Sequence, residues 1–200
     1  ERMPVVYSPD VDAILYFTRS LDKSGGDAEL KHVYWLADIN GNNRRVLFDS
    51  PIEWDDFLNA VTTDHCYSPD GKQIAVATTD NGRGLRDQKN PGRAVPAIVS
   101  EEGEAELVPC ELGSCGGFGF IDAGLLVLDT PGLIGGQGYQ LRLHGKGEVK
   151  TLHADEKVAA SCLRISPDRR SAAFFVSSHV GSAMVRLRHV NLRTAEVSDS

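Results

Sequence analysis

Long apolar runs are absent from this 200-residue sequence. Its hydrophobic residues come in short groups, as at positions 14–17 and 125–128. A transmembrane helix needs roughly 18 or more consecutive apolar residues, so the sequence predicts no membrane span. Short apolar groups bounded by polar residues are instead typical of β-strands.

Clusters of basic residues are also absent. The formal net charge is −7, and the adjacent basic pairs Arg44-Arg45 and Arg169-Arg170 lie in or beside predicted turns and strands. Binding to a phosphate backbone depends on grouped Lys and Arg side chains. We therefore expect no nucleic-acid partner.

Two segments resemble catalytic motifs but lack the parts that the chemistry needs. LLVLDTPG at 125–132 resembles a GTPase switch element, yet no G-x-x-x-x-G-K-[ST] phosphate loop is present, so the segment is expected to be a strand that ends in a Pro-Gly turn. GSCGG at 113–117 matches G-x-C-x-G, but a nucleophile elbow requires a following helix, and the β-like sequence FGF follows here. The sequence thus predicts no catalytic residue and no cofactor.

Four cysteines allow a disulfide if the compartment is oxidising. Cys110 and Cys115 are close enough in sequence to close a small ring and are the candidate pair. Cys66 and Cys162 lie in apolar strand patterns, where a thiol behaves as a small hydrophobe. Two cysteines do not make a tetrahedral zinc site, so no metal is expected.

A repeated tripeptide organises the chain. Ser8-Pro9-Asp10 recurs at Ser68-Pro69-Asp70 and Ser166-Pro167-Asp168, and positions 118–124 keep a degenerate copy. Proline presets φ, aspartate caps the local backbone and a glycine tolerates positive φ, as a tight turn requires. The predicted turn residues are Asp10, Asp70, Gly71, Asp122 and Asp168. A ring of these aspartates could hold calcium, but turn capping already explains them.

Each copy joins two strand-like segments, such as those at 65–67 and 74–78. Two more strand-like segments follow it, as at 139–143 and 149–152, or at 185–190 and 195–198. Internal repeats of this kind indicate solenoids or propellers. The sequence therefore predicts an all-β fold: a β-propeller of four four-stranded antiparallel blades in one domain spanning 1–200. The blades are expected at about 4–49, 64–109, 117–153 and 161–200. They would form a complete small propeller or part of a larger one.

The pattern of strand, SPDG turn and strand, clearest at 67–77, resembles the WD40-like repeats of TolB-type and prolyl-oligopeptidase-type propellers. The resemblance covers nearly the whole chain and is weakest in the third unit. It implies the fold more than an activity. It also suggests a periplasmic or extracellular protein, whose signal segment would lie outside these residues.

One segment, at about 51–59, has helical features. Ser50 is a candidate N-cap, Pro51 suits the first helical turn, and Glu53 completes a capping box. The apolar spacing that follows is partly helical. The helix would cover the edge of the core or bind a partner.

The long connections are expected at one end of the blades, because alternate connections of an antiparallel sheet share an end. They are predicted at 18–32, at the helix that begins after Ser50, and at 79–92, 110–117 and 129–138. Loops on a rigid scaffold often carry binding residues. The candidate binding face comprises Trp54, Asp55, Asp56, Arg83, Arg86, Lys89 and Arg93.

The predicted function is a non-enzymatic scaffold that binds a protein or other ligand. The first alternative is the gating propeller of a serine peptidase whose catalytic part lies elsewhere. The second is a propeller hydrolase or lyase with its site at the mouth of the channel.

Overall fold

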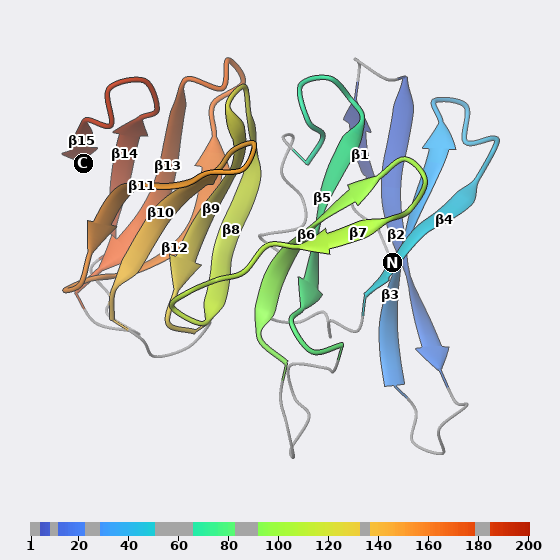
Figure 1. Ribbon diagram of the computed structural model, residues 1–200, viewed down its shortest axis with the longest axis horizontal. Coiled ribbons are helices and arrows are strands. Elements are labelled where there is room, and N and C mark those ends of the chain that lie inside the picture. Colours follow the sequence, from blue (N-terminus) through green and yellow to red (C-terminus); the bar gives the residue numbers. More distant parts are fainter. Residues whose placement is uncertain are drawn as a thin grey trace. The chain divides into compact units, whose positions relative to one another are not determined.

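The computed structural model describes residues 5–8, 12–22, 29–50, 66–82, 92–132, 137–178 and 185–200. In these ranges the chain forms four antiparallel sheets, so the all-β prediction is confirmed (Figure 1). The chain divides into two compact units, Glu1–Pro109 and Cys110–Ser200. The predicted helix at 51–59 lies outside the described residues.

The first unit contains two sheets. The first sheet has the order β1 (Val5–Ser8), β2 (Ala13–Asp22), β3 (Glu29–Asp38) and β4 (Arg45–Ser50). The second sheet has the order β5 (Gln73–Thr79), β6 (Ala94–Ser100) and β7 (Ala105–Leu107). The sequence predicted a further strand at 65–67, but an isolated bridge between Tyr67 and Ile74 takes its place.

Small side chains allow the two sheets of the first unit to approach closely. Ala77 on β5 is fully buried, and its carbonyl oxygen accepts hydrogen bonds from Ser50 Oγ at 3.0 Å and from the Tyr34 hydroxyl at 3.5 Å. The strand bearing Ala77 is buried along almost its whole length. A strand covered on both faces explains the continuous apolar run in its sequence.

The second unit contains two complete four-stranded sheets. One consists of β8 (Ser114–Ile121), β9 (Gly124–Thr130), β10 (Tyr139–His144) and β11 (Val149–Asp155), in that order. The other consists of β12 (Ala159–Ile165), β13 (Ser171–Ser177), β14 (Val185–Asn191) and β15 (Val197–Asp199). One core joins them, with Leu128 and Leu141 packing in the same cluster as Leu163, Phe174 and Val190.

A glycine lets β8 and β12 meet. Gly117 has φ +153°, and a Cβ atom added to it would lie 2.7 Å from the Cβ of Leu163. Each of the two strands carries a bulge near this point, between Cys115 and Gly117 and between Ser161 and Arg164. The first strands of two successive sheets therefore pack backbone against side chain, as in neighbouring blades of a propeller.

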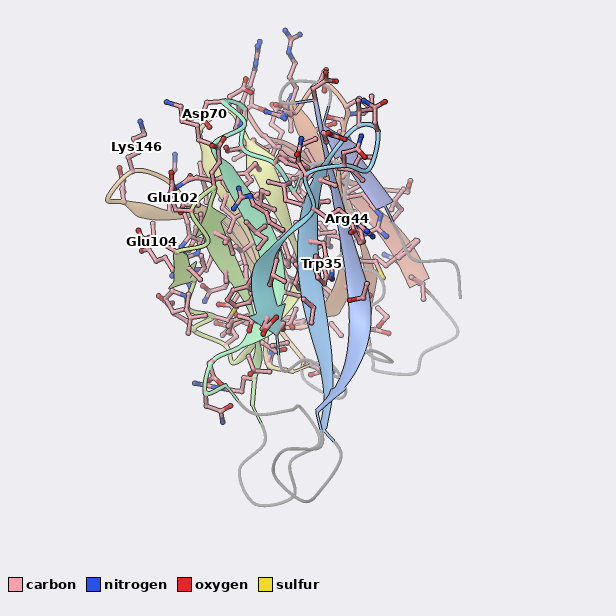
Figure 2. The ribbon with its side chains drawn as sticks, turned by 90° about the vertical axis from the view of Figure 1, so that its right-hand side faces the viewer. Trp35, Arg44, Asp70, Glu102, Glu104 and Lys146 are labelled. Carbon is pink, nitrogen blue, oxygen red and sulfur yellow. The ribbon has the colours of Figure 1, made fainter. Side chains whose placement is uncertain are left out.

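Two copies of the repeated tripeptide form the same turn. Ser68 Oγ donates to Asp70 Oδ1 and Ser166 Oγ donates to Asp168 Oδ1, each at 2.6 Å. In both turns the serine oxygen also accepts a backbone N–H from the residue five positions later, at 2.9 Å and 3.0 Å. Figure 2 shows Asp70 at the end of the first of these turns.

The other two copies cannot be matched to this turn. Pro9 and Asp10 lie outside the described residues. Asp122 lies in a two-residue turn, because Ile121 pairs directly with Gly124 across the hairpin. The degenerate third copy therefore has a shorter turn than the two SPD copies, in which Ser68 pairs with Gln73 and Ser166 pairs with Ser171.

Within the described ranges, the structure contains no helix with the length and apolar character needed to cross a bilayer.

Candidate functional site

The two ends of each sheet carry different connections. In the sheet of β8 to β11, residues 122–123 and 145–148 join strands at one end, while residues 108–113, 131–138 and 156–158 connect at the other. In the first unit, residues 80–93 join β5 to β6 at the end opposite the turn at 101–104. We call the long-connection end of each sheet the end at which residues 23–28, 80–93, 131–138 and 178–184, respectively, join two of its strands.

Two of the predicted long loops are shorter than expected. The loop predicted at 18–32 is largely strand, since β2 continues to Asp22 and pairs there with Glu29 of β3. The loop predicted at 110–117 ends earlier, because β8 begins at Ser114. Cross-strand pairing extends through polar and Gly-rich sequence that carries no apolar strand signal.

A buried carboxylate lies at the long-connection end of the β8–β11 sheet. Asp129, near the end of β9, is fully buried. One of its oxygens, Oδ2, accepts the backbone N–H of Glu111 at 2.6 Å, and the N–H of Leu112 lies 3.2 Å from both oxygens. The carboxylate thus fixes the connection that leads into β8.

An arginine on the neighbouring strand completes this network. Arg142 of β10 has a side chain only 5% exposed, and its Nη1 lies 3.3 Å from Asp129 Oδ2. Its Nη2 donates to Glu111 Oε1 at 2.7 Å, although the Glu111 side chain is 63% exposed. We call Glu111, Asp129 and Arg142 the anchor triad, because together they tie the 108–113 connection to two strands.

Burial dominates the electrostatics of the anchor triad. Burial raises the pKa of Asp129, and the hydrogen bonds from Leu112 and Glu111 and the charge of Arg142 oppose that rise. The pKa of His144, also on β10, is lowered by burial and by the positive charge of Arg142. The site therefore favours a neutral imidazole beside a paired guanidinium.

The two candidate disulfide residues meet beside the triad. Cys115 lies opposite Asp129 in the β8–β9 register, and its thiol donates to the carbonyl oxygen of Gly117 at 3.3 Å. The Cys110 side chain lies close enough to raise the pKa of the Cys115 thiol. The structure contains both residues as thiols, so it brings the pair together without showing the bond.

Of the seven residues predicted to form the binding face, the structure describes only Arg93. Arg93 precedes β6, and its Nε donates to Asp80 Oδ2 at 2.7 Å, with the arginine side chain 62% exposed. The other predicted residues, Trp54, Asp55, Asp56, Arg83, Arg86 and Lys89, lie outside the described residues.

A second charged cluster links the two sheets of the second unit. Arg188 on β14 binds Asp199 through Nε and Nη2, at 2.6 Å and 2.7 Å, and its Nη1 donates to Asp155 Oδ2 at 2.9 Å. The same nitrogen donates to the Tyr139 hydroxyl at 2.8 Å. A guanidinium with three partners on other strands fixes the relative position of the sheets at this point.

Sequence reasoning missed both charged clusters. Asp129 belongs to LLVLDTPG, whose sequence predicts only a strand that ends in a turn. Arg142 lies in the alternating sequence YQLRLH. The available signal was an aspartate and an arginine at interior positions of two neighbouring apolar strands, because buried charges are usually paired.

The described residues include no candidate metal-binding site. Among the ranges that the structure describes, no group of three or more His, Cys, Asp or Glu side chains is arranged to hold an ion.

Comparison with known proteins gives the fold. No family model matches the chain, and neither does any curated protein. Among solved structures, putative TolB from Agrobacterium tumefaciens matches at 14% identity and a TM-score of 0.59, over 96% of this chain and 62% of that one. An oligogalacturonate lyase in complex with manganese matches at 15% identity and a TM-score of 0.61, over 98% of this chain and 52% of that one.

A further oligogalacturonate lyase, from Vibrio parahaemolyticus, matches at 13% identity and a TM-score of 0.53, over 98% of this chain and 51% of that one. This chain therefore spans from about half to about three fifths of the length of these neighbours. The likeness supports a β-propeller fold, as the repeated turns predicted, and at such identities it shows the fold alone.

Proposed function

We propose that this protein is a non-enzymatic β-propeller scaffold that binds a protein partner through the long-connection ends of its blades. The anchor triad is the observation that carries the proposal. It holds the 108–113 connection rigidly while leaving the side chain of Glu111 63% exposed. A preorganised loop loses less conformational entropy on binding than a loop that must first be ordered.

The chemistry of the triad favours a positioning role. Burying a charge pair carries a desolvation penalty that a well-packed apolar pair avoids. Two backbone N–H groups of the connection end on the buried carboxylate, and an apolar side chain could not accept them. We therefore infer that the anchor triad is there to fix the position of the 108–113 connection, because an apolar pair would stabilise the sheet equally well.

The predicted residues of the first unit belong to the same proposal. We include Trp54, Asp55, Asp56, Arg83, Arg86, Lys89 and Arg93 as a binding face of the first unit, because in sequence they belong to the segments that follow β4 and β5. We also propose a periplasmic or extracellular location, which follows from the TolB-type resemblance.

Quantitative affinity capture tests the proposal. The bait proteins would be the wild type, Glu111→Arg at the long-connection end, and Lys146→Glu at the opposite end of the same sheet. We expect a partner that is retained by wild type and Lys146→Glu, and depleted about tenfold or more by Glu111→Arg, which corresponds to about 1.4 kcal/mol. Matching melting temperatures would show that all three baits are folded. Equal depletion by both variants would overturn the proposed face.

Conversion of a substrate by the purified chain would overturn the proposal that the protein is not an enzyme. The purified chain would be incubated with ester, lactone and oligogalacturonide substrates, and we expect no product above the buffer control.

The alternative function, as the gating propeller of a serine peptidase, is tested by the sequence of the full-length gene. A G-x-S-x-G sequence on a strand–turn–helix elsewhere in the full-length gene would favour a gating propeller instead.

A further inference from the structure

Two thiols lie together at the base of the connection that the anchor triad holds. Cys110 and Cys115 flank residues 111–114; Cys115 is paired with Asp129 across β8 and β9, and Asp129 accepts the N–H of Glu111, the residue after Cys110, at 2.6 Å. Cys115 is fully buried, whereas Cys110 retains 8% of its exposure. Two thiols that a fixed connection holds near each other are positioned for oxidation, because disulfide geometry tolerates little separation of the two residues.

We propose that Cys110 and Cys115 are a redox modification site, at which a reversible disulfide closes the 110–115 loop and fixes it to β8. The bond requires little rearrangement of the loop, because Asp129 already holds the N–H groups of Glu111 and Leu112. The inference concerns covalent chemistry and does not depend on the proposed binding function.

The oxidant would be a second disulfide, such as oxidised glutathione or an oxidised dithiol protein. The more exposed Cys110 attacks first as its thiolate, forming a mixed disulfide and releasing one thiol of the oxidant. The Cys115 sulfur then attacks Cys110 Sγ, forming the internal bond and releasing the second thiol. The protein loses two hydrogens, and the oxidant gains them as two thiols.

The surroundings of Cys115 assign it the second step. Burial, the neighbouring Cys110 thiol and the charge of Asp129 all raise its pKa, so its thiolate is scarce. A disulfide carries no ionisable proton and introduces no charge beside the buried carboxylate. The site therefore accommodates the oxidised pair more readily than a free thiolate.

The remaining cysteines provide internal controls. Cys66 is buried in the first unit, and Cys162 lies half-buried at the bulge of β12 with φ +60°.

Peptide mapping of the full chain tests the proposal without any variant. The protein would be equilibrated in oxidised or reduced glutathione, blocked by alkylation and digested. No lysine or arginine lies between residues 94 and 141, so trypsin leaves both cysteines in one peptide ending at Arg142. Cleavage after Glu111 then separates the cysteines unless a disulfide joins them.

We expect the oxidised sample to yield a peptide two hydrogens lighter, whose fragments after Glu111 cleavage separate only on reduction. Cys66 and Cys162 should stay alkylated. Full alkylation of Cys110 and Cys115 under oxidising conditions would overturn the proposal. So would capture of Cys110 and Cys115 as glutathione adducts, or their pairing with Cys66 or Cys162.

A thermal measurement tests the effect on the loop. We expect oxidation to raise the Tm of the wild type and of Cys162→Ala by about 5 °C. Oxidation should leave the Tm of Cys110→Ala unchanged. An oxidised wild type with an unchanged Tm would show that the bond does not fix the loop.

Discussion

Replacing Arg142 with leucine tests the anchor triad. The substitution keeps an apolar stem in β10 but removes the cation that faces Asp129 across 3.3 Å. The fully buried carboxylate would then retain only its two backbone N–H donors. Removing one partner of a buried ion pair typically costs about 3–5 kcal/mol, because the other charge is left without compensation.

The expected loss is a large part of the stability of such a chain. For a protein of this size, about 4 kcal/mol corresponds to a decrease in Tm of roughly 8–16 °C. Urea unfolding followed by tryptophan fluorescence would give the free energy of unfolding. The m-value should stay constant, since the variant would expose the same surface on unfolding.

The pH dependence of the free energy of unfolding shows whether the lost stability comes from the uncompensated charge of Asp129. Burial already raises the pKa of Asp129 above its ordinary value of 3.8, and loss of the neighbouring cation should raise it further. A carboxyl group with a raised pKa binds its proton more readily in the folded state, so folding is favoured as pH falls towards 3.8. The stability difference between wild type and Arg142→Leu should therefore narrow from pH 7 towards pH 4.

Arg93→Leu is the matched control. It also removes an arginine from an ion pair, with Asp80, but its side chain is 62% exposed. Pairs of that kind contribute about 0–1 kcal/mol. A cost below 1 kcal/mol for Arg142→Leu, or a cost that does not change with pH, would refute the reasoning.

Three further substitutions test other parts of the fold by equilibrium unfolding. Gly124→Ala should cost about 3 kcal/mol or more, because a Cβ there would lie 2.2 Å from the carbonyl oxygen of His144; a cost below 1 kcal/mol would contradict the hairpin geometry. Arg169→Gly should stabilise the protein by up to about 1 kcal/mol, since Arg169 has φ +57° where the equivalent turn has Gly71; destabilisation would contradict the equivalence of the turns. Arg188→Met should cost about 2–4 kcal/mol, because it breaks hydrogen bonds with two carboxylates. These carboxylates have pKa values held below 3.8, so the wild type should lose more stability than Arg188→Met as pH falls below 3.8, and equal losses would contradict the pairing.

The repeated turns made most of the strands predictable. Ser, Pro and Asp at fixed positions specify a reversal through local hydrogen bonds, and the apolar groups beside them supply the strands. Residues 139–143 and 185–190, for example, were predicted as strands and lie within β10 and β14. Where strands continue through polar residues, as β2 and β3 do near Asp22 and Glu29, register with a partner strand decides the boundary.

The candidate site was less predictable, because it depends on contacts between separate strands. The proximity of Cys110 and Cys115 could be read from their spacing. The pairing of Asp129 with Arg142 could not, since it requires knowing which faces of β9 and β10 point the same way. The charge of Glu111 looks like an ordinary surface charge until its hydrogen bond to Arg142 is known.

Site-specific photo-crosslinking tests the central claim, that a partner binds at the long-connection ends. A photoreactive amino acid would replace Glu111 in one protein and Lys146 in another; both residues are exposed, at opposite ends of one sheet, and Figure 2 shows Lys146 extending away from its turn. The crosslinked peptides would then be identified by mass spectrometry. We predict that one protein is crosslinked from position 111 and not from position 146. Crosslinking of the same protein from position 146 alone, or equally from both positions, would contradict the account.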